Sequence, residues 1–245
     1  MGYPSVLILG CGRSGTSIFG ELFDHLADYS YYSEPSFAQL PQLVAPRGMA
    51  IKVPKESPNY PPDPGLSFPM AQLQKWLPKP IVYYWQIRHP LDTICSLKVG
   101  IARNWGHHPR PPDWREWSSE PLICRCAHHW NYLNSVAYEQ VAELVKICRF
   151  EEMLSDPLSF AMGVLEDIGL DLTENELFIQ SWANRVQNTN NAQFLEAATS
   201  RAYSTNDHRV RIGRWRENMT AEELALVLPI IARTAEERGY INLLE

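Results

Sequence analysis

The stretch SVLILGCGRSGTSIFGELFDHL, residues 5–26, constrains the fold more than any other part of this chain. Its first residues, 5–9, are a short apolar run typical of a strand buried on both faces. The glycine loop GCGRSGTS, residues 10–17, follows at once, and apolar residues then recur at helical spacing: Ile18, Phe19, Leu22, Phe23 and Leu26. This order predicts an anion cradle, because glycines let backbone N–H groups face a phosphate and the helix N-terminus adds its positive end.

The glycine loop departs from the Walker A pattern of nucleotidases in its cation. Gly10 and Gly15 have the Walker spacing, but the next residue is Thr16 where that pattern has lysine, and the loop's cation is Arg13. No later expected strand ends in an aspartate suited to hold magnesium, which a γ-phosphate usually needs. A sulfuryl group carries one fewer charge, so an arginine and oriented N–H groups could hold it without a metal. The alternative is a glycine turn that merely joins strand to helix.

The segment GCGRSGTS resembles the 5′-phosphosulfate loop of sulfotransferases that use 3′-phosphoadenosine 5′-phosphosulfate (PAPS). That loop reads roughly Pro-x-Lys/Arg-Ser-Gly-Thr-Thr/Ser, and Cys11 stands where the family often has proline. The resemblance implies PAPS as the donor co-substrate, with no metal. The donor-binding residues that it implies in this loop are Cys11, Gly12, Arg13, Ser14, Gly15, Thr16 and Ser17.

Two further stretches resemble sulfotransferase motifs in the same order. Arg88, Pro90 and Ser96 follow an expected strand at 81–87 and match the family's 3′-phosphate motif, in which arginine offers a charge-assisted fork and serine a hydroxyl. The stretch RVRIGRWRENMTAEE resembles the family's basic C-terminal loop and capped helix. Its implied donor-binding residues are Arg209, Arg211, Gly213, Arg214 and Trp215, where the two earlier arginines stand in for an Arg-Lys-Gly that is not literal here, and Thr220 with Glu223 predicts a capping box.

The resemblance also implies catalytic roles for Glu34, Lys52 and Arg13. Lys52 ends an expected strand at 49–53, where the family places a lysine that reaches the oxygen bridging phosphate and sulfate; Lys55 competes for this role. Glu34 precedes Pro35, as the acidic base does in some related enzymes, and a salt bridge holding the tyrosine-rich segment is its alternative. Pro54 stands where cytosolic sulfotransferases have a histidine base. The histidines at 107 and 108 are alternative bases.

Length, charge and cysteine content set outer limits. A chain of 245 residues fits one α/β domain over 1–245. The net charge of −6, with a pI of about 5.7, argues against nucleic acid as a partner, and no apolar run approaches the roughly 18 residues of a membrane span. Five cysteines without framework spacing and no signal-peptide pattern favour the cytoplasm. Cys124, Cys126, His128 and His129 could suggest zinc, but a packed helix is the favoured interpretation.

The remaining segments carry secondary expectations. Tyr29, Tyr31 and Tyr32 could pack under a loop, and residues 59–69 form either a surface connection or a wall of the acceptor pocket. Residues 102–117 are expected to form an acceptor-facing lid, with a packed surface loop as the alternative. One helix is expected over 120–144, then a strand over 145–149. Trp182 is a candidate for stacking on adenine, and Thr173 with Glu176 for a capping box.

Together these features predict an α/β three-layer P-loop sandwich, with a mostly parallel sheet of about five strands and helices on both faces. The function implied is transfer of a sulfuryl group from PAPS to a hydroxyl or amine of a small-molecule, lipid or glycan acceptor. The alternatives are a P-loop nucleotide kinase and a catalytically silent nucleotide-binding protein. The acceptor and the oligomeric state stay open.

Overall fold

The computed structural model describes residues 2–36, 38–52, 70–102, 104–187 and 212–244. Over these residues the sheet has five strands, all parallel, in the order β2-β3-β1-β4-β5. The strands are β1 (Ser5–Gly10), β2 (Tyr29–Ser33), β3 (Gly48–Lys52), β4 (Ile81–Ile87) and β5 (Val145–Arg149). The predicted α/β class and mostly parallel sheet are confirmed.

The central strand β1 positions the glycine loop. All of its residues are buried, and it pairs with β3 on one side and β4 on the other. Parallel strands end at the same edge of a sheet, which is where open α/β sheets bind ligands. The glycine loop, Lys52 at the end of β3 and Arg88 just after β4 therefore share one edge.

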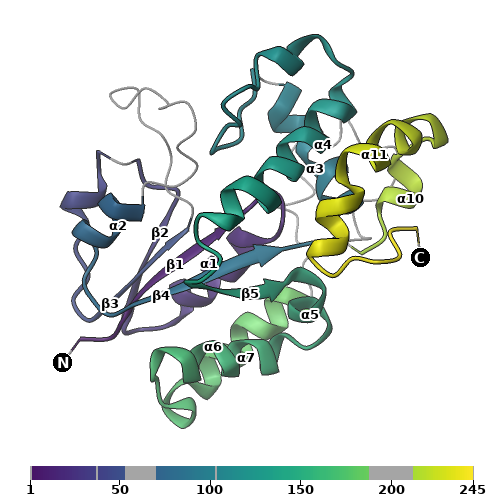
Figure 1. The fold of residues 1–245 in the computed structure, drawn as a ribbon. Helices are drawn as coiled ribbons and strands as arrows, with labels where there is room; N and C mark the ends of the chain where they lie inside the picture. The colour runs from purple at the N-terminus through teal and green to yellow at the C-terminus, as the bar shows by residue number, and fades with distance from the viewer. Residues whose placement is uncertain (1, 37, 53–69, 103, 188–211, 245) are drawn as a thin grey trace.

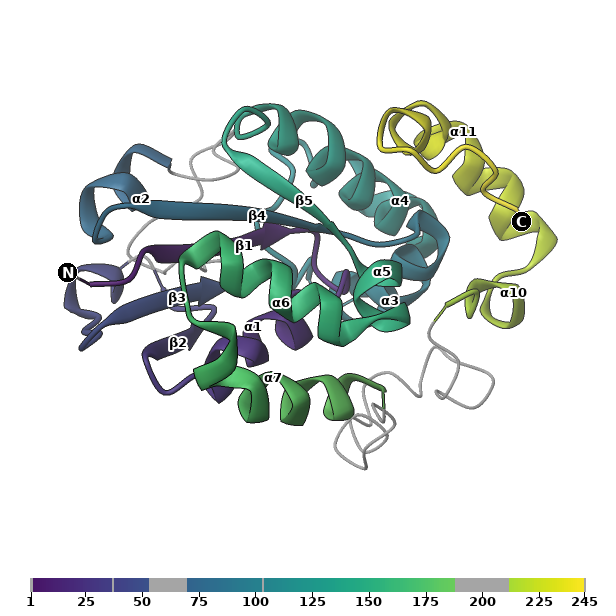
Figure 2. The ribbon, with the colours of Figure 1, turned by 90° about the horizontal axis from the view of Figure 1, so that it is seen from below.

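Helices cover both faces of the sheet (Figures 1 and 2). Residues of β1 contribute to three cores: Val6 and Ile8 to the first, Leu9 to the second, and Leu7 to a smaller third. The first core is built with α1 (Thr16–His25), α5 (Phe150–Ser155), α6 (Pro157–Ile168) and α7 (Leu172–Gln187). The second is built with α3 (Pro90–Ala102), α4 (Leu122–Tyr132) and α11 (Ala221–Glu237). Shorter elements are η1 (Leu40–Gln42), α2 (Met70–Trp76), η2 (Glu116–Ser119) and α10 (Trp215–Asn218).

Strand β2 was not predicted, because its tyrosines were expected to pack under a loop. It pairs in parallel with β3 along its whole length, from Tyr29 opposite Gly48 to Ser33 opposite Lys52. The Tyr29 ring packs on Phe23 of α1, with ring centroids 5.2 Å apart. These tyrosines hold an edge strand against the first helix. The register also places Glu34, the next residue, beside Lys52.

The helix expected over 120–144 is only partly regular. The α-helical part is α4, and a π-helical turn, η3 (Leu133–Ala137), follows it. The Asn134 carbonyl accepts a hydrogen bond from Arg238 Nε at 2.7 Å, and its side-chain amide donates to the Trp130 carbonyl at 3.0 Å. These contacts occupy backbone acceptors at the irregular turn. Across the described residues, no helix combines the length and apolarity that crossing a membrane requires.

The two predicted capping boxes have different outcomes. The one at Thr220 and Glu223 is confirmed and opens α11. The one at Thr173 is wrong, because Asp171 caps α7 instead: its carboxylate accepts from the N–H groups of Thr173 at 2.7 Å and Glu174 at 3.0 Å.

Candidate active site

The glycine loop has a shape that requires glycine at two positions. Gly10 has a φ of 139°, and a Cβ there would lie 2.3 Å from the carbonyl oxygen of Gln86. Gly15 has a φ of 93°, and a Cβ there would meet the ring of Phe150 at 2.3 Å. Among the described residues no side chain caps the N-terminus of α1, which leaves its first N–H groups for a ligand.

Three side chains of the glycine loop are buried, those of Cys11, Ser14 and Thr16. The Ser14 hydroxyl is buried and has no hydrogen-bond partner within the described residues. A buried polar group of this kind usually has a partner, so Ser14 fits a site that receives a polar ligand. Cys11 is also buried, and burial raises the pKa of its thiol. The thiol therefore stays protonated, and Cys11 contributes packing rather than charge.

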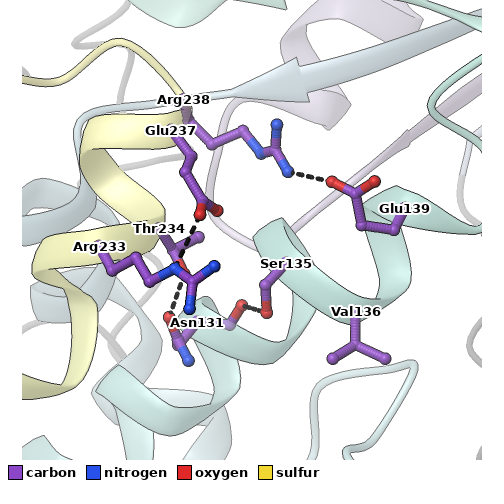
Figure 3. A pocket seen from close by; sticks show the side chains of 8 residues that line it. All are labelled: Asn131, Ser135, Val136, Glu139, Arg233, Thr234, Glu237 and Arg238. Carbon is purple, nitrogen blue, oxygen red and sulfur yellow. Dashed lines mark hydrogen bonds and ion pairs between the residues drawn. The ribbon is translucent and has the colours of Figure 1, made fainter.

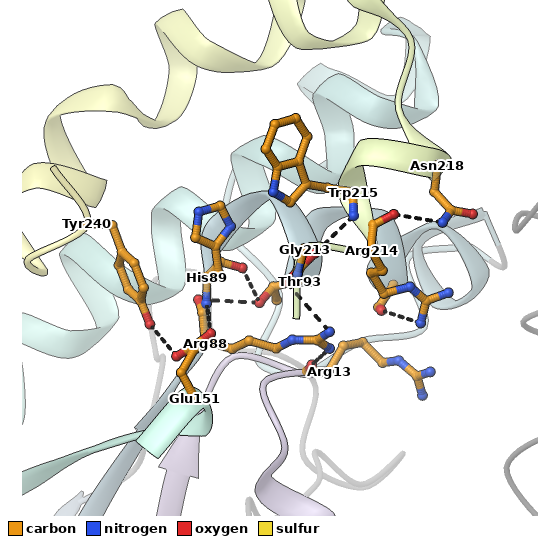
Figure 4. A network of polar contacts seen from close by, with 12 residues as sticks. Arg13, Arg88, His89, Thr93, Glu151, Gly213, Arg214, Trp215, Asn218 and Tyr240 are labelled. Carbon is orange, nitrogen blue, oxygen red and sulfur yellow. Dashed lines mark hydrogen bonds and ion pairs between the residues drawn. The ribbon is translucent and has the colours of Figure 1, made fainter. Parts of the chain in front are cut away.

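Three arginine side chains meet at this edge of the sheet (Figure 4). Arg13 comes from the glycine loop, Arg88 from the end of β4, and Arg214 from the residue before α10. Arg88 Nη1 donates to the Arg13 carbonyl oxygen at 3.2 Å. Arg214 Nη1 lies 3.5 Å from Ser96 Oγ, at the outer limit of a hydrogen bond. The sequence placed these residues in three separate motifs, and the fold brings the motifs together.

Desolvation and, to a smaller extent, the charge of Arg214 disfavour the charged forms of Arg13 and Arg88. Arg88 is buried above the ring of Phe150, and its pKa is lowered to about 10, mainly by burial and also by Arg214, while Asp92 acts in the opposite direction. Arg13 stays exposed, but partial desolvation and then the charge of Arg214 lower its pKa as well. Cations held together at such a cost suit a ligand with more than one negative charge.

Lys52 and Glu34 form an ion pair beside the glycine loop. Lys52 Nζ lies 2.5 Å from Glu34 Oε1 and donates to Ser17 Oγ at 2.8 Å. The Glu34 backbone N–H also donates to the Lys52 carbonyl at 2.9 Å, and Glu34 has a φ of 52°. The fold therefore brings two of the three predicted catalytic residues into contact, with Glu34 in a backbone conformation that is uncommon outside glycine. Lys55 lies outside the described residues.

Ser96 and the C-terminal segment lie next to Arg88. Ser96 is buried on α3. Trp215 is buried, its ring stacks on His89 at a centroid distance of 6.3 Å, and Arg216 covers it at 4.8 Å. Trp215 thus packs against the residue that follows Arg88. Other predicted donor-binding residues, Arg209 and Arg211, lie outside the described residues.

His107 reaches the glycine loop from the segment expected to be a lid. Its ring lies between Gly12 and Gly100: a Cβ at Gly12 would be 2.9 Å from His107 Nδ1, and one at Gly100 2.2 Å from Nε2. The pKa of His107 is lowered to about 4, mainly by burial and also by the charges of Arg13, His108 and Lys52, against the opposite effect of Glu34. His107 is therefore neutral near pH 7, and its electrostatic neighbours are the predicted catalytic residues.

The rest of this segment favours the packed-loop alternative over an open lid. Trp105 is buried, and its Nε1 donates to His129 Nδ1 at 3.1 Å. The Trp105 ring also packs on Trp114 and Trp117, with centroids 5.9 and 6.1 Å apart. The tryptophan rings pack on one another, and His129, which accepts the hydrogen bond from Trp105, packs on the ring of His107 with centroids 5.9 Å apart.

Two minor expectations are settled by burial. Trp182 is wrong as an adenine-stacking residue: it is fully buried, its Nε1 donates to the Ile18 carbonyl at 2.9 Å, and its ring packs on Phe160. Cys124 and Cys126 are buried in α4, as the packed-helix interpretation expected. Within the described residues, no group of three or more histidine, cysteine, aspartate or glutamate side chains could hold a metal ion.

A pocket of about 540 Å³ lies between η3 and α11 and contains none of the predicted site residues (Figure 3). Its charged groups are paired with each other: Arg233 Nε lies 2.9 Å from Glu237 Oε1, and Arg238 Nη2 2.7 Å from Glu139 Oε1. The positive and negative charges that line this pocket therefore balance, unlike those of the arginine cluster at the sheet edge.

Comparison with known proteins bears on the fold of this chain. No family model matches the sequence, and no curated protein matches it. Among solved structures, mouse sulfotransferase SULT7A1 complexed with PAP is 15% identical, with a TM-score of 0.57 over 95% of this chain and 85% of that chain. Sulfotransferase STF9 from Mycobacterium avium is 14% identical, with a TM-score of 0.54 over 96% of this chain and 76% of that one.

A sulfotransferase domain from the curacin biosynthetic pathway is 11% identical, with a TM-score of 0.56 over 98% of this chain and 99% of that one. The chain therefore has the α/β fold of the sulfotransferases. The resemblance drawn from the sequence motifs is confirmed at the level of the fold.

Proposed function

We propose that this protein is a sulfotransferase that moves a sulfuryl group from PAPS to a hydroxyl or amine of a small-molecule, lipid or glycan acceptor. The observation that carries the proposal is the convergence of Arg13, Arg88 and Arg214 on a glycine loop without the Walker lysine. The sulfotransferase fold and the PAP in the SULT7A1 structure support it. The cysteines, all free and buried, are in keeping with a cytoplasmic enzyme.

The donor would be held at its two charged ends. The backbone N–H groups at the start of α1, the Ser14 hydroxyl and Arg13 are placed to hold the 5′-phosphosulfate. Arg88, Ser96 and Arg214 would hold the 3′-phosphate, which would account for a buried arginine, a half-buried one and a buried hydroxyl beside the loop. When bound, PAPS supplies an activated sulfuryl group, and every other contribution comes from the protein.

Lys52 and Glu34 are proposed as the catalytic pair. The Lys52 ammonium lies at the end of β3 between Ser17 and Glu34, and it can turn to the bridging oxygen as negative charge develops there. Such electrostatic stabilisation is worth on the order of 10²–10³ in rate. The Glu34 carboxylate would accept the proton of the attacking hydroxyl or amine. Arg13 would stabilise the charge on the transferring group.

Ligand-induced stabilisation tests the proposed donor. We expect adenosine 3′,5′-bisphosphate to raise the melting temperature without magnesium, because the arginines supply the counter-charge. At a hundred times the dissociation constant the gain is about 2.7 kcal/mol, or roughly 5–10 °C for a chain of this size. ATP with magnesium is the matched comparison. A shift as large with ATP, or one that depends on magnesium, would favour the nucleotide-kinase alternative instead.

A further inference from the structure

Asp92 is a buried carboxylate that joins two parts of the proposed donor site. It lies on α3, fully inaccessible to solvent. Its Oδ2 accepts a hydrogen bond from the Gly213 N–H at 2.8 Å, and its Oδ1 accepts one from the Trp215 N–H at 3.0 Å. Gly213 has a φ of 76°, so the chain turns sharply at the point where Asp92 holds it. Both carboxylate oxygens are thus occupied by backbone donors 121 and 123 residues further along the chain.

The residue between these two donors is Arg214. Because Gly213 and Trp215 are both fixed to Asp92, the backbone of Arg214 is held from both sides. Its guanidinium lies by Ser96, one turn further along α3 from Asp92. Asp92 also faces Arg88, with Oδ2 4.0 Å from Arg88 Nη2. One carboxylate therefore contacts the segment that presents Arg214 and the side chain of Arg88 (Figure 4 shows both arginines).

We propose that Asp92 is a positioning residue that fixes Arg214 opposite Arg88 and Ser96, and so determines the preference for a 3′-phosphorylated nucleotide. The inference rests on the proposed function. It adds a residue that touches no ligand but sets the geometry of the groups that do. Without it, the backbone on either side of Arg214 would lose these two hydrogen bonds to α3.

Two roles of Asp92 would act in opposite directions on phosphate affinity, which makes the sign of a measured change informative. As a counter-charge alone, Asp92 weakens phosphate binding, because it neutralises part of the field of Arg88. As a positioning residue, it strengthens phosphate binding through Arg214. Asp92→Asn removes the charge and one of the two backbone contacts, since the Asn amide nitrogen cannot accept a hydrogen bond.

The experiment compares two nucleotides that differ only in the 3′-phosphate. We expect Asp92→Asn to weaken adenosine 3′,5′-bisphosphate binding about tenfold to a hundredfold, with less than about a threefold change for adenosine 5′-phosphate. Asp171→Asn is the matched control, because Asp171 also accepts two backbone N–H groups but caps α7 outside the site. It should change neither affinity. Tighter binding of the bisphosphate, or an equal loss for both nucleotides, overturns the positioning role.

Hydrogen exchange on the ligand-free wild type provides an arm that does not depend on the nucleotide or on the folding of a variant. The amides of Gly213 and Trp215 should exchange at least tenfold more slowly than unprotected amides, because each donates to a buried acceptor. Unprotected amides at both positions overturn the inference. If these amides are protected but the wild type does not prefer the bisphosphate over adenosine 5′-phosphate, the proposed donor is wrong while the anchor itself stands.

Discussion

Replacing Glu34 with glutamine separates catalysis from structure at the proposed base. Glu34 is paired with Lys52 at 2.5 Å, and its side chain is 33% exposed while that of Lys52 is 8% exposed. Glutamine keeps an acceptor oxygen for the Lys52 ammonium but cannot take a proton. We therefore expect a stability loss of only about 0.5–1 kcal/mol, the range of a partly solvated ion pair, which lowers the melting temperature by roughly 1–4 °C.

The expected loss of turnover is much larger. A positioned general base contributes about 10²–10⁴ in rate, so kcat should fall by that factor while the affinity for adenosine 3′,5′-bisphosphate changes little. Turnover is measured as bisphosphate released from PAPS, with a hydroxyl or amine acceptor found by screening a panel.

The chain offers a matched control in Glu223 and Lys98. These side chains lie 2.8 Å apart, with 27% and 11% exposure, close to the values of the catalytic pair. Glu223→Gln should cost a similar amount of stability and leave turnover unchanged. If Glu34→Gln keeps its turnover within about threefold and melts early, then Glu34 is a structural residue. The base would then be sought at His107, which is neutral near pH 7 and lies against Gly12.

Three further predictions concern the donor site and its scaffold. Arg88→Ala should weaken adenosine 3′,5′-bisphosphate binding about ten- to a hundredfold in calorimetry and spare adenosine 5′-phosphate, because a charge-assisted fork to the 3′-phosphate is lost; equal losses would make Arg88 structural. Gly10→Ala should lower the free energy of unfolding, measured in urea, by more than about 2 kcal/mol, because its Cβ would lie 2.3 Å from the Gln86 carbonyl oxygen. Gly163→Ala, where a Cβ on α6 meets open space, should instead raise the free energy of unfolding by about 0.5–1 kcal/mol. The pKa of His107 falls from 6.5 to about 4 on folding, so the unfolded chain takes up the proton at a higher pH than the folded protein. The free energy of unfolding should therefore decline as the pH drops from about 6.5 to 4. His107→Gln should make this decline shallower, and an unchanged pH dependence would assign the decline to other groups.

The parts of the fold that were predicted correctly have local sequence signals. The apolar run before the glycine loop, the β-branched and aromatic strand before Arg88, and the capping box at Thr220 each lie within a few residues. Strand β2 lacks such a signal, because YSYYS exists as a strand through its pairing with β3 and its packing on α1. The predicted cap of α7 was wrong because Asp171 and Thr173 are both common capping residues, and the sequence does not distinguish them. In the structure the Asp171 carboxylate accepts the first N–H groups of the helix.

The motifs of the site were predicted from the sequence, whereas the contacts that join one motif to another were not. Arg88 and Ser96 could be matched by spacing, but Asp92 between them gave no distinct signal, because its partners lie more than a hundred residues away. Helical spacing alone pairs Asp92 with Arg88 at i and i+4, which could have drawn attention to it. The aromatic residue Trp182 was misplaced in the same way, since its partner, the Ile18 carbonyl, is 164 residues distant.

The charge balance of the site favours an anionic ligand beside Arg88. At 4.0 Å and an effective dielectric constant of about 20, Asp92 attracts Arg88 by about 4 kcal/mol before desolvation. The pKa of Arg88 nevertheless falls from 12.5 to about 10, so burial and the neighbouring arginines outweigh that attraction by about 3 kcal/mol. The guanidinium is still charged at neutral pH, and the folded protein carries this cost in a chain whose net charge is −6. A phosphate dianion beside Arg88 offsets the cost, whereas a neutral ribose hydroxyl leaves it in place. Relief of these destabilised arginine charges is therefore expected to contribute to the proposed preference for a 3′-phosphate, beside the positioning of Arg214 by Asp92. This contribution should weaken as salt screens the interaction of the arginines with the phosphate.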